Sequence, residues 1–439
     1  MRIDALRNNI KSKLSSSDIA QRMASGAFWN VLGMSVSKCL VLFGGIFCAR
    51  ILGKYDFGAF GMVRTTINMF LVFGGTGLGL TATKYISEYK ASQINNVYNI
   101  YRLTNYFALL FGLVISLLVF LFAEFLAINM LNSEDLVIPI QVSSVILFVT
   151  SLNLAQNGTL AGLENFKAIA INTFIGGVFE VFMMLIGAYF YGIIGAVLGY
   201  GFGYVVILSC NHISIKKSFK RLGIQKTNDF NLRAGFKILL SFTLPATLSS
   251  IVVAPIIWII RTMLIRENGF GDGAIFEAAE QWRIIALFVP GAVSQIVLPI
   301  LSSLVNVDEC KFKKVLNINI ALNASISLFF AIIICLFSSI IMGLYGDGFT
   351  DPIPLILLSF STIFTAVGNV IGLSISSRAK MWVGFALNSL WGVMVIIFTY
   401  LFLSNEMGVR GLSLAILLSY ILHACFQYIY VRLLLNKIN

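Results

Sequence analysis

Long apolar stretches, each of a length that can cross a lipid bilayer, fill most of this 439-residue sequence. A helix that spans the hydrocarbon core needs about 20 apolar residues. Because backbone polar groups must be satisfied inside lipid, stretches of this length favour α-helices. We therefore expect an all-α membrane protein with twelve transmembrane helices. Their approximate limits are 23–49, 57–83, 100–127, 136–161, 167–189, 191–214, 236–264, 274–304, 313–343, 352–376, 380–403 and 410–434.

The composition agrees with a chain that lies mostly in lipid. Charged residues make up 11% of the sequence and hydrophobic residues 58%, whereas an ordinary soluble domain carries about 25% charged residues. The six cysteines show no Cys-x-x-Cys spacing, and the two histidines lie far apart. We therefore expect no metal site, no cofactor and no Ser/His/Asp triad. The connections between spans are too short for a catalytic domain, so we predict no enzyme activity and no catalytic residues.

Basic residues give the chain a net charge of +12. If both termini are cytoplasmic, most Lys and Arg residues lie on cytoplasmic segments, as the positive-inside rule requires. The charge then reflects membrane topology, and no nucleic-acid partner is needed to explain it.

The longest polar connection, residues 215–235, is strongly basic and separates two sets of six spans. We predict a cytoplasmic N-terminal segment over residues 1–22 and an N-lobe of helices 1 to 6 over residues 23–214. A basic cytoplasmic linker follows over residues 215–235, and a C-lobe of helices 7 to 12 occupies residues 236–439. Paired halves are common in transporters, which bind their substrate between them.

A weak internal repeat supports this division. Residues 57–70 can be aligned with residues 276–288, with Arg64 opposite Arg283. Proline residues add an asymmetry, because four of the seven fall inside the predicted spans 7 and 8. Proline inside a helix removes a hydrogen bond and kinks the helix, so these two spans are expected to bend. The four are Pro245, Pro255, Pro290 and Pro299.

Several charged residues fall inside predicted spans, where a charge costs about 2.5–3.5 kcal/mol at the bilayer centre on insertion scales. Such residues usually face a bundle interior or a water-filled cavity. Four cations lie on the first two helices of each half, so two facing halves would direct them into one anion-attracting cavity. The seven residues are Lys38, Arg64, Glu180, Arg261, Glu277, Glu280 and Arg283.

Other interpretations of these charges remain open. Glu280 and Arg283 have the i,i+3 spacing of an ion pair on one helix face. Arg64 and Arg261 could instead lie just below the lipid headgroups. Glu180 could pair with a cation, pack as a protonated acid, or take part in proton or ion coupling, and we name Glu180 and Glu280 as the candidates for coupling.

The early part of the chain resembles the polysaccharide-export flippases of bacteria. Their A-R-x-L-G motif is matched by Ala49, Arg50, Leu52 and Gly53, followed by a Phe-Gly pair, a Gly-Leu pair and a basic residue. A later A-G-x-x-x-F stretch is also similar. The remaining matching residues are Phe57, Gly58, Gly77, Leu78, Lys84, Ala161, Gly162 and Phe166.

The resemblance is strongest to the Wzx-type O-antigen flippases of the multidrug/oligosaccharidyl-lipid/polysaccharide (MOP) superfamily. It implies a V-shaped, MATE-like pair of six-helix lobes in the bacterial inner membrane, with a cationic central cavity and alternating access. It also implies an undecaprenyl-diphosphate-linked oligosaccharide, such as a lipopolysaccharide repeat unit, as substrate. The cationic role is carried over as a type to the residues Lys38, Arg64, Arg261, Arg283 and Arg50.

Three functions are compared on this basis. A lipid-linked oligosaccharide flippase fits the cations best, with membrane lipid, a polysaccharide polymerase and a chain-length regulator as implied partners. A multidrug/cation antiporter of the same fold is the alternative, although it would call for an acidic cavity. A membrane enzyme such as a polymerase or ligase usually has a sizeable external loop, which this sequence lacks. No GxxxxGK[ST] loop is present, so transport would not draw on bound nucleotide.

Overall fold

The computed structural model describes residues 18–226, 243 and 252–436, apart from residues 95, 306 and 379. Every regular element in these residues is a helix, which confirms the predicted all-α class. The first half contains α2 (Asp18–Gly74), α3 (Thr76–Ser92), α4 (Asn96–Leu121), η1 (Phe125–Met130), η2 (Glu134–Leu136), α5 (Val137–Gly162) and α6 (Phe166–Leu222). The second half contains α9 (Val253–Ala286), α10 (Phe288–Leu304), α11 (Glu309–Leu336), α12 (Ser338–Gly343), α13 (Ile353–Ser377), α14 (Met381–Ser404) and α15 (Gly408–Asn436).

Eight helices in the described residues are long and apolar enough to cross a membrane. Two of them, α2 and α6, contain a non-helical glycine that joins two antiparallel arms, so each provides two of the predicted spans. Helix α9 is broken in the same way at Gly269 and is continued by α10. The arrangement agrees with the predicted twelve spans wherever the chain is described.

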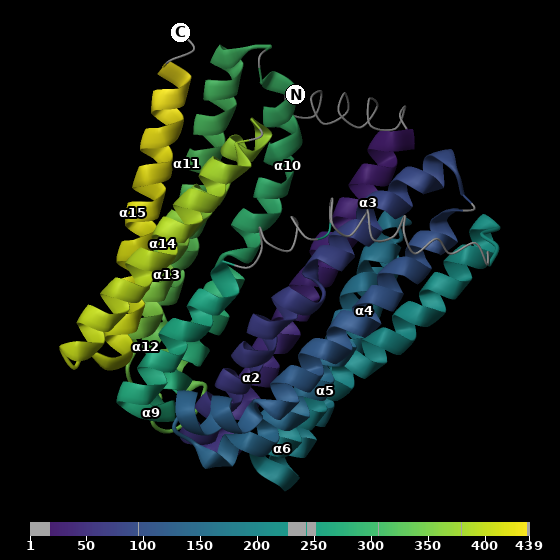
Figure 1. The fold of residues 1–439 in the computed structure, drawn as a ribbon. Helices are drawn as coiled ribbons and strands as arrows, with labels where there is room; N and C mark the ends of the chain where they lie inside the picture. The colour runs from purple at the N-terminus through teal and green to yellow at the C-terminus, as the bar shows by residue number, and fades with distance from the viewer. Residues whose placement is uncertain are drawn as a thin grey trace, which may run out of the picture.

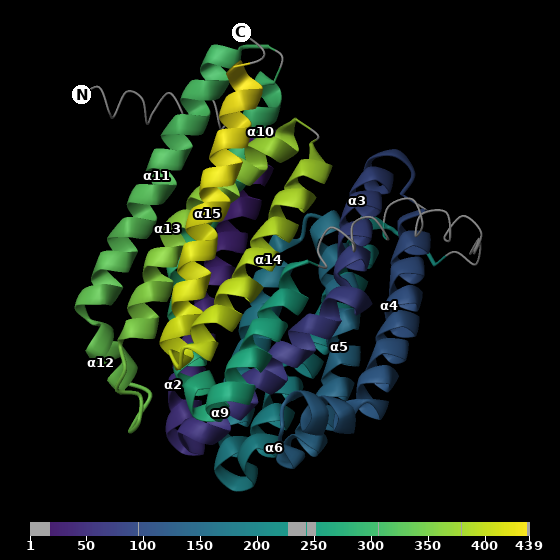
Figure 2. The same ribbon diagram turned by 60° about the vertical axis from the view of Figure 1, so that its left-hand side comes forward.

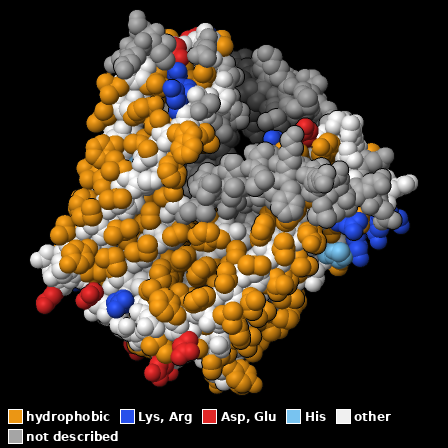
Figure 3. Space-filling view, in the orientation of Figure 1, with side chains coloured by type: hydrophobic (Ala, Val, Ile, Leu, Met, Phe, Trp, Pro, Cys, Tyr) orange, Lys and Arg blue, Asp and Glu red, His pale blue; other side chains and the backbone are white. Residues whose placement is uncertain are grey.

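The helices form two lobes that diverge toward the end carrying the C-terminus and meet at the opposite end (Figures 1 and 2). Helices α2 to α6 pack on one another in the N-lobe, and α9 to α15 do so in the C-lobe. The main contact between the lobes joins α2 to α9. Hydrophobic side chains cover the middle of the face shown in Figure 3, and charged side chains gather toward its ends, as a membrane protein requires.

The turn glycines define the internal repeat. Gly53 in α2 and Gly269 in α9 both have φ of 78°, and Gly192 in α6 and Gly408 at the start of α15 have φ of 57° and 53°. Glycine adopts this left-handed region without steric cost. Both pairs are separated by 216 residues. This register sets Arg64 opposite Glu280, so the sequence alignment of Arg64 with Arg283 was wrong by three residues.

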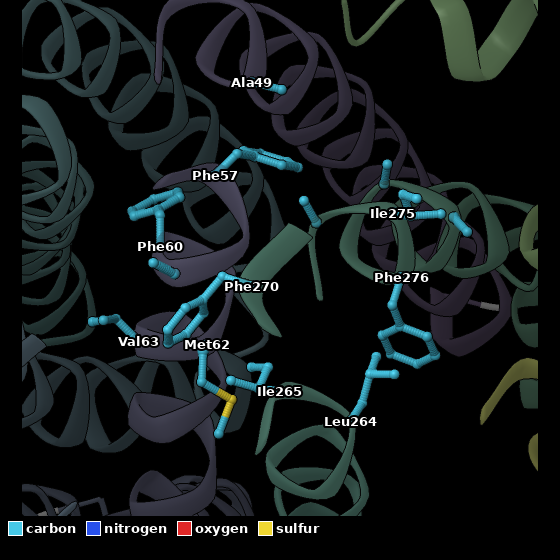
Figure 4. Close-up of a cluster of buried hydrophobic side chains, with 14 of the residues drawn as sticks. Ala49, Phe57, Phe60, Met62, Val63, Leu264, Ile265, Phe270, Ile275 and Phe276 are labelled. Carbon is cyan, nitrogen blue, oxygen red and sulfur yellow. The ribbon is translucent and has the colours of Figure 1, made fainter. Parts of the chain in front are cut away.

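The lobes meet at a packed region that we call the sealed end, made by Tyr55, Phe57, Phe270, Tyr345 and Phe349. The rings of Tyr55 and Phe270 lie 5.2 Å apart, edge to face, and Phe57 lies 6.0 Å from Tyr345 and 6.2 Å from Phe349. Figure 4 shows Phe270 of α9 pointing toward Met62 and Val63 of α2.

Gly58 of α2 permits this close approach, because a Cβ there would collide with the backbone of Phe270 and Ala274 in α9. Small residues allow helices in a membrane to pack backbone against backbone. Gly58 therefore fixes how closely the two lobes approach each other at this end.

Two hydrogen bonds cross the sealed end in a reciprocal arrangement. Arg50 of the N-lobe donates from Nε to the backbone carbonyl of Leu344 in the C-lobe at 2.6 Å. Arg266 of the C-lobe donates to the carbonyl of Asn129 in the N-lobe at 3.4 Å. Arg50 and Arg266 are again 216 residues apart. Equivalent arginines of the two halves therefore each donate a hydrogen bond to the opposite lobe.

Some boundaries differ from the sequence expectation. Helix α6 continues to Leu222, so the predicted linker over residues 215–235 begins as helix, and its later part lies outside the described residues. Most of the predicted segment over residues 1–22 also lies outside them, as does Pro245. The expected bend in span 8 is found at Leu287, where α9 ends and α10 begins, three residues before Pro290.

Candidate functional site

A cavity of about 440 Å³ lies where the N-lobe faces α9. Its walls come from both arms of α2, from α5 and from both arms of α6, and α9 closes one side with residues that include Glu277 and Gln281. Among the charged residues named from sequence, those that line this cavity are Lys38, Arg64, Glu180 and Glu277.

Arg64 is held on the cavity wall by aromatic and acidic neighbours. Its guanidinium lies 5.3 Å from the ring centroid of Tyr200 and 5.7 Å from that of Phe60. Nη1 lies 3.5 Å from Glu277 Oε1, while Nε is buried without a hydrogen-bond partner among the described residues. The side chain of Arg64 is nevertheless 19% exposed, so the guanidinium can contact a ligand in the cavity.

Lys38 and Glu180 line the same cavity from the first arms of α2 and α6. Neither side chain forms an ion pair within the described part of the chain. The two arms pack closely, since a Cβ at Gly44 of α2 would meet Val181 of α6. A cation and a carboxylate are thus both open to a ligand.

Glu277 links the two lobes. Its Oε2 accepts a hydrogen bond from Arg261 Nη1 at 2.6 Å, and its Oε1 faces Arg64. Arg261 Nη1 also donates to Thr65 Oγ1 on α2 at 2.8 Å, and its guanidinium lies 4.9 Å from the ring centroid of Phe276. These contacts form a buried bridge of Arg64, Glu277 and Arg261 between α2 and α9.

Two glycines of α2 make room for this bridge. A Cβ at Gly61 would lie 3.0 Å from the side chain of Glu277, and a Cβ at Gly45 would collide with Gln281. Gln281 in turn accepts a hydrogen bond from the Tyr345 hydroxyl at 3.1 Å. Polar side chains of α9 can therefore reach the cavity beside the N-lobe.

Arg283 lies inside the C-lobe and does not line the cavity. It forms the i,i+3 ion pair with Glu280 at 2.8 Å, which was one of the interpretations left open by the sequence. Its Nε donates to Ser361 Oγ at 3.1 Å, and its guanidinium lies 5.1 Å from the ring centroid of Tyr420. Glu280 is engaged in this cluster and is also absent from the cavity wall.

The structure thus separates the five cations named from sequence. Lys38 and Arg64 line the cavity, whereas Arg261 contacts a lining residue, Glu277. Arg283 forms its ion pair inside the C-lobe, and Arg50 is exposed at the sealed end. The charged lining residues are two cations and the two carboxylates of Glu180 and Glu277. The sequence identified Glu277 as an intramembrane charge without finding its role, because its partner Arg64 is 213 residues away.

Two six-helix lobes that meet at one end beside a charged cavity are the fold of MATE-like transporters. A multidrug resistance MATE family transporter of the MOP superfamily in its inward-facing conformation superposes with a TM-score of 0.79, at 17% identity, covering 93% of this chain and 98% of that one. An outward-facing MATE family transporter gives a TM-score of 0.66 at 19% identity, covering 97% and 98%. A MOP superfamily transporter from Pyrococcus furiosus, described as having a binding pocket of reverse polarity, gives 0.66 at 18% identity, covering 97% of each chain.

The chain belongs to the polysaccharide biosynthesis protein family, whose model matches residues 23–305. The EPS I polysaccharide export inner membrane protein EpsE of Ralstonia nicotianae is 24% identical over 208 residues, which is 47% of each chain. EpsE of Ralstonia solanacearum is 23% identical over 201 residues, 44% of this chain and 45% of that one. The matched region spans about half the length of these relatives. Family and fold agree with the resemblance inferred from the A-R-x-L-G motif, and these proteins are exporters and transporters, not enzymes.

Proposed function

We propose that the protein is a flippase that moves an undecaprenyl-diphosphate-linked oligosaccharide from the inner to the outer leaflet of the bacterial inner membrane by alternating access. The observation that carries this proposal is that Lys38 and Arg64 line the cavity between the lobes in a member of a polysaccharide biosynthesis family. The names of the EpsE relatives, which place them in polysaccharide export and in the inner membrane, support it.

The diphosphate is the part of such a substrate whose transfer into lipid costs the most free energy. It must cross about 30 Å of hydrocarbon, and an unpaired buried charge is strongly unfavourable. Lys38 supplies a compact positive charge, and Arg64 can hold phosphate oxygens in a bidentate fork. The sugars would occupy the polar cavity, and the polyprenyl tail would stay in lipid.

The bridge of Arg64, Glu277 and Arg261 gives the substrate a means to shift the lobes. A diphosphate that engages Arg64 competes with Glu277 for the same guanidinium. This weakens a contact that holds α2 to α9, and a ligand shifts a conformational equilibrium only through such differential interactions. We propose that substrate binding favours separation of the lobes at the sealed end.

The proposed starting state opens toward the cytoplasm. The lobes diverge at the end that carries the C-terminus, and the positive-inside rule favours a cytoplasmic location for both termini. The higher TM-score to an inward-facing transporter than to an outward-facing one supports the same state.

We propose a polysaccharide polymerase and a chain-length regulator as functional partners.

The two cavity cations provide the test. We expect Lys38→Gln and Arg64→Gln to reduce surface polysaccharide strongly in cells whose only copy of the flippase is the variant. Lys311→Gln, at a side chain that is 73% exposed, serves as the control. Surface polysaccharide at wild-type levels in both cavity variants, with normal protein levels, would contradict the proposal.

Glu180 is our candidate for energy coupling, because it lines the cavity without an ion-pair partner among the described residues. Its protonation would change the charge of the cavity by one unit. In proteoliposomes, Glu180→Gln should make transport independent of a proton gradient. If the variant responds to the gradient like the wild type, Glu180 has no coupling role.

A multidrug/cation antiporter is the second candidate, and one observation favours it. The cavity wall carries two carboxylates, Glu180 and Glu277, as well as two cations. Carboxylates are the groups that would attract a cationic drug. Efflux of cationic dyes from cells, abolished by Glu180→Gln and unaffected by Arg64→Gln, would support this function over the flippase.

A further inference from the structure

We propose that one side of the cavity is a saccharide subsite, formed by the amides of Asn68, Asn153 and Asn157, which we call the amide wall. This proposal deepens the flippase function and rests on it. The amide wall would hold hydroxyl groups of the sugars nearest the diphosphate, while Lys38 and Arg64 hold the diphosphate. All five side chains line the same cavity.

Helical spacing places the amides next to the cations. Asn68 lies four residues after Arg64 on α2, and residues at this spacing are neighbours on one helix face. Asn153 and Asn157 have the same spacing on α5. Each helix therefore presents two cavity side chains one above the other, and on α2 a cation and an amide are adjacent. A ligand with a charged group joined to a neutral polar group matches this order.

The amides retain free hydrogen-bonding capacity. Asn153 is 4% exposed, and its Nδ2 donates to the backbone carbonyl of Tyr204 at 2.8 Å, while its Oδ1 has no partner in the described residues. Buried polar atoms are almost always hydrogen-bonded, so this free acceptor needs an explanation. A hydroxyl donated by a ligand would supply the missing partner.

Asn157 offers the complementary group. Its Oδ1 accepts from Asn211 Nδ2 at 2.9 Å, and Asn211 Oδ1 accepts from Asn172 Nδ2 at 2.9 Å. This chain of amides fixes the orientation of Asn157 and leaves its Nδ2 without a protein acceptor where the chain is described. A free acceptor on Asn153 and a free donor on Asn157, one helical turn apart, suit hydroxyl groups, which both donate and accept.

The buried amides that join helix arms differ from the amides of the proposed subsite. Asn172 and Asn211 are 5% and 0% exposed. They bond to each other, to Ser214 and to Asn157 Oδ1, as expected of polar side chains that join membrane helices. Asn68 is exposed to the cavity and has no hydrogen-bond partner in the described residues. Joining helices therefore does not explain Asn68, whereas ligand binding does.

Because its amides are neutral, the amide wall is expected to bind sugar hydroxyls and not phosphate. Amides carry no net charge, so they offer hydrogen bonds to neutral hydroxyls and no counter-charge to a phosphate. The diphosphate is therefore held by Lys38 and Arg64, and the neutral sugars face the amides.

The test compares two probes in binding titrations with the full-length protein in detergent: undecaprenyl diphosphate, and the glycosylated undecaprenyl diphosphates extracted from the bacterium that makes the protein. Loss of one neutral hydrogen bond weakens binding about five-fold. We expect Asn68→Leu and Asn157→Ala each to weaken binding of the glycosylated lipid by this factor and to leave undecaprenyl diphosphate unchanged. Arg64→Met should weaken binding of both lipids.

Asn105→Leu is the matched control. Within the described part of the chain, Asn105 bonds only to the carbonyl of Tyr101 on its own helix, and it does not line the cavity. It should bind both lipids like the wild type. Equal binding of the glycosylated lipid by wild type and Asn68→Leu would overturn the subsite, as would a parallel loss of both lipids in Asn68→Leu. A wild type that binds neither lipid would instead overturn the flippase function itself.

Discussion

The carboxylate of Glu277 lies 2.6 Å from Arg261 and 3.5 Å from Arg64, with only 9% of its side chain exposed. One acid therefore neutralises parts of two buried guanidinium groups that belong to different lobes. Removing one partner of a buried ion pair leaves an uncompensated buried charge. This lowers stability more than replacing both partners with apolar residues. At the scale of single residues, Glu277 has the largest expected effect on stability.

We predict that Glu277→Gln lowers the free energy of unfolding in detergent by about 3 kcal/mol, because Arg261 loses its counter-ion. The double variant Glu277→Gln/Arg261→Met removes both charges and should lose less than the sum of the two single variants. Thermal unfolding of the purified proteins measures this. Glu406→Gln, at an exposed turn, should leave unfolding unchanged. Unfolding of Glu277→Gln at the wild-type temperature would show that the bridge contributes nothing.

At the scale of helices, the sequence predicted most of the fold because bilayer thickness is a strong constraint. The spans over residues 352–376 and 380–403 agree with α13 and α14 to within a few residues. The pairing of Glu280 with Arg283 could also be foreseen, since it depends only on local spacing. The contact of Arg64 with Glu277 could not, because it depends on how two helices from different lobes pack.

Gly58 offers a test of that packing between α2 and α9. We predict that Gly58→Val pushes the lobes apart at the sealed end, because the added side chain would collide with the backbone of α9. Cys48 of α2 is fully buried and can report on this change. When Cys48 is the only cysteine kept, a water-soluble maleimide should label it rapidly in the Gly58→Val protein and slowly in the protein that retains Gly58.

Gly343→Val is a suitable control for Gly58→Val, since a Cβ at Gly343 would meet nothing within 4 Å. It should leave the labelling of Cys48 slow. If the Gly58→Val protein also protects Cys48, the close helix approach at Gly58 does not hold the sealed end shut.

At the scale of the whole molecule, the two halves repeat one design with different side chains at the centre. The turn glycines and the reciprocal bonds of Arg50 and Arg266 keep the two-fold relation. At the centre it is lost, because Arg64 corresponds to Glu280 in this register. The helical scaffold is thus symmetric, whereas the cavity lies almost wholly on the N-lobe. The sequence analysis did not predict this asymmetry, because it placed cavity cations on both lobes.

Alternating access requires the sealed end to open once in each cycle. Tyr55 and Phe270 face each other across it, so Tyr55→Cys/Phe270→Cys joined by a short bifunctional thiol reagent should stop transport of the glycosylated lipid in proteoliposomes. Phe179→Cys/Phe202→Cys joins the two arms of α6 within the N-lobe, where the two rings lie 6.3 Å apart. Its cross-link should leave transport unchanged, because the proposed mechanism moves the N-lobe as a unit. Both proteins carry no other cysteine, so that only the intended pair reacts. Transport at the uncross-linked rate after complete reaction of the Tyr55/Phe270 pair would mean that the substrate leaves without opening of the sealed end, and the two-lobe mechanism would then be wrong.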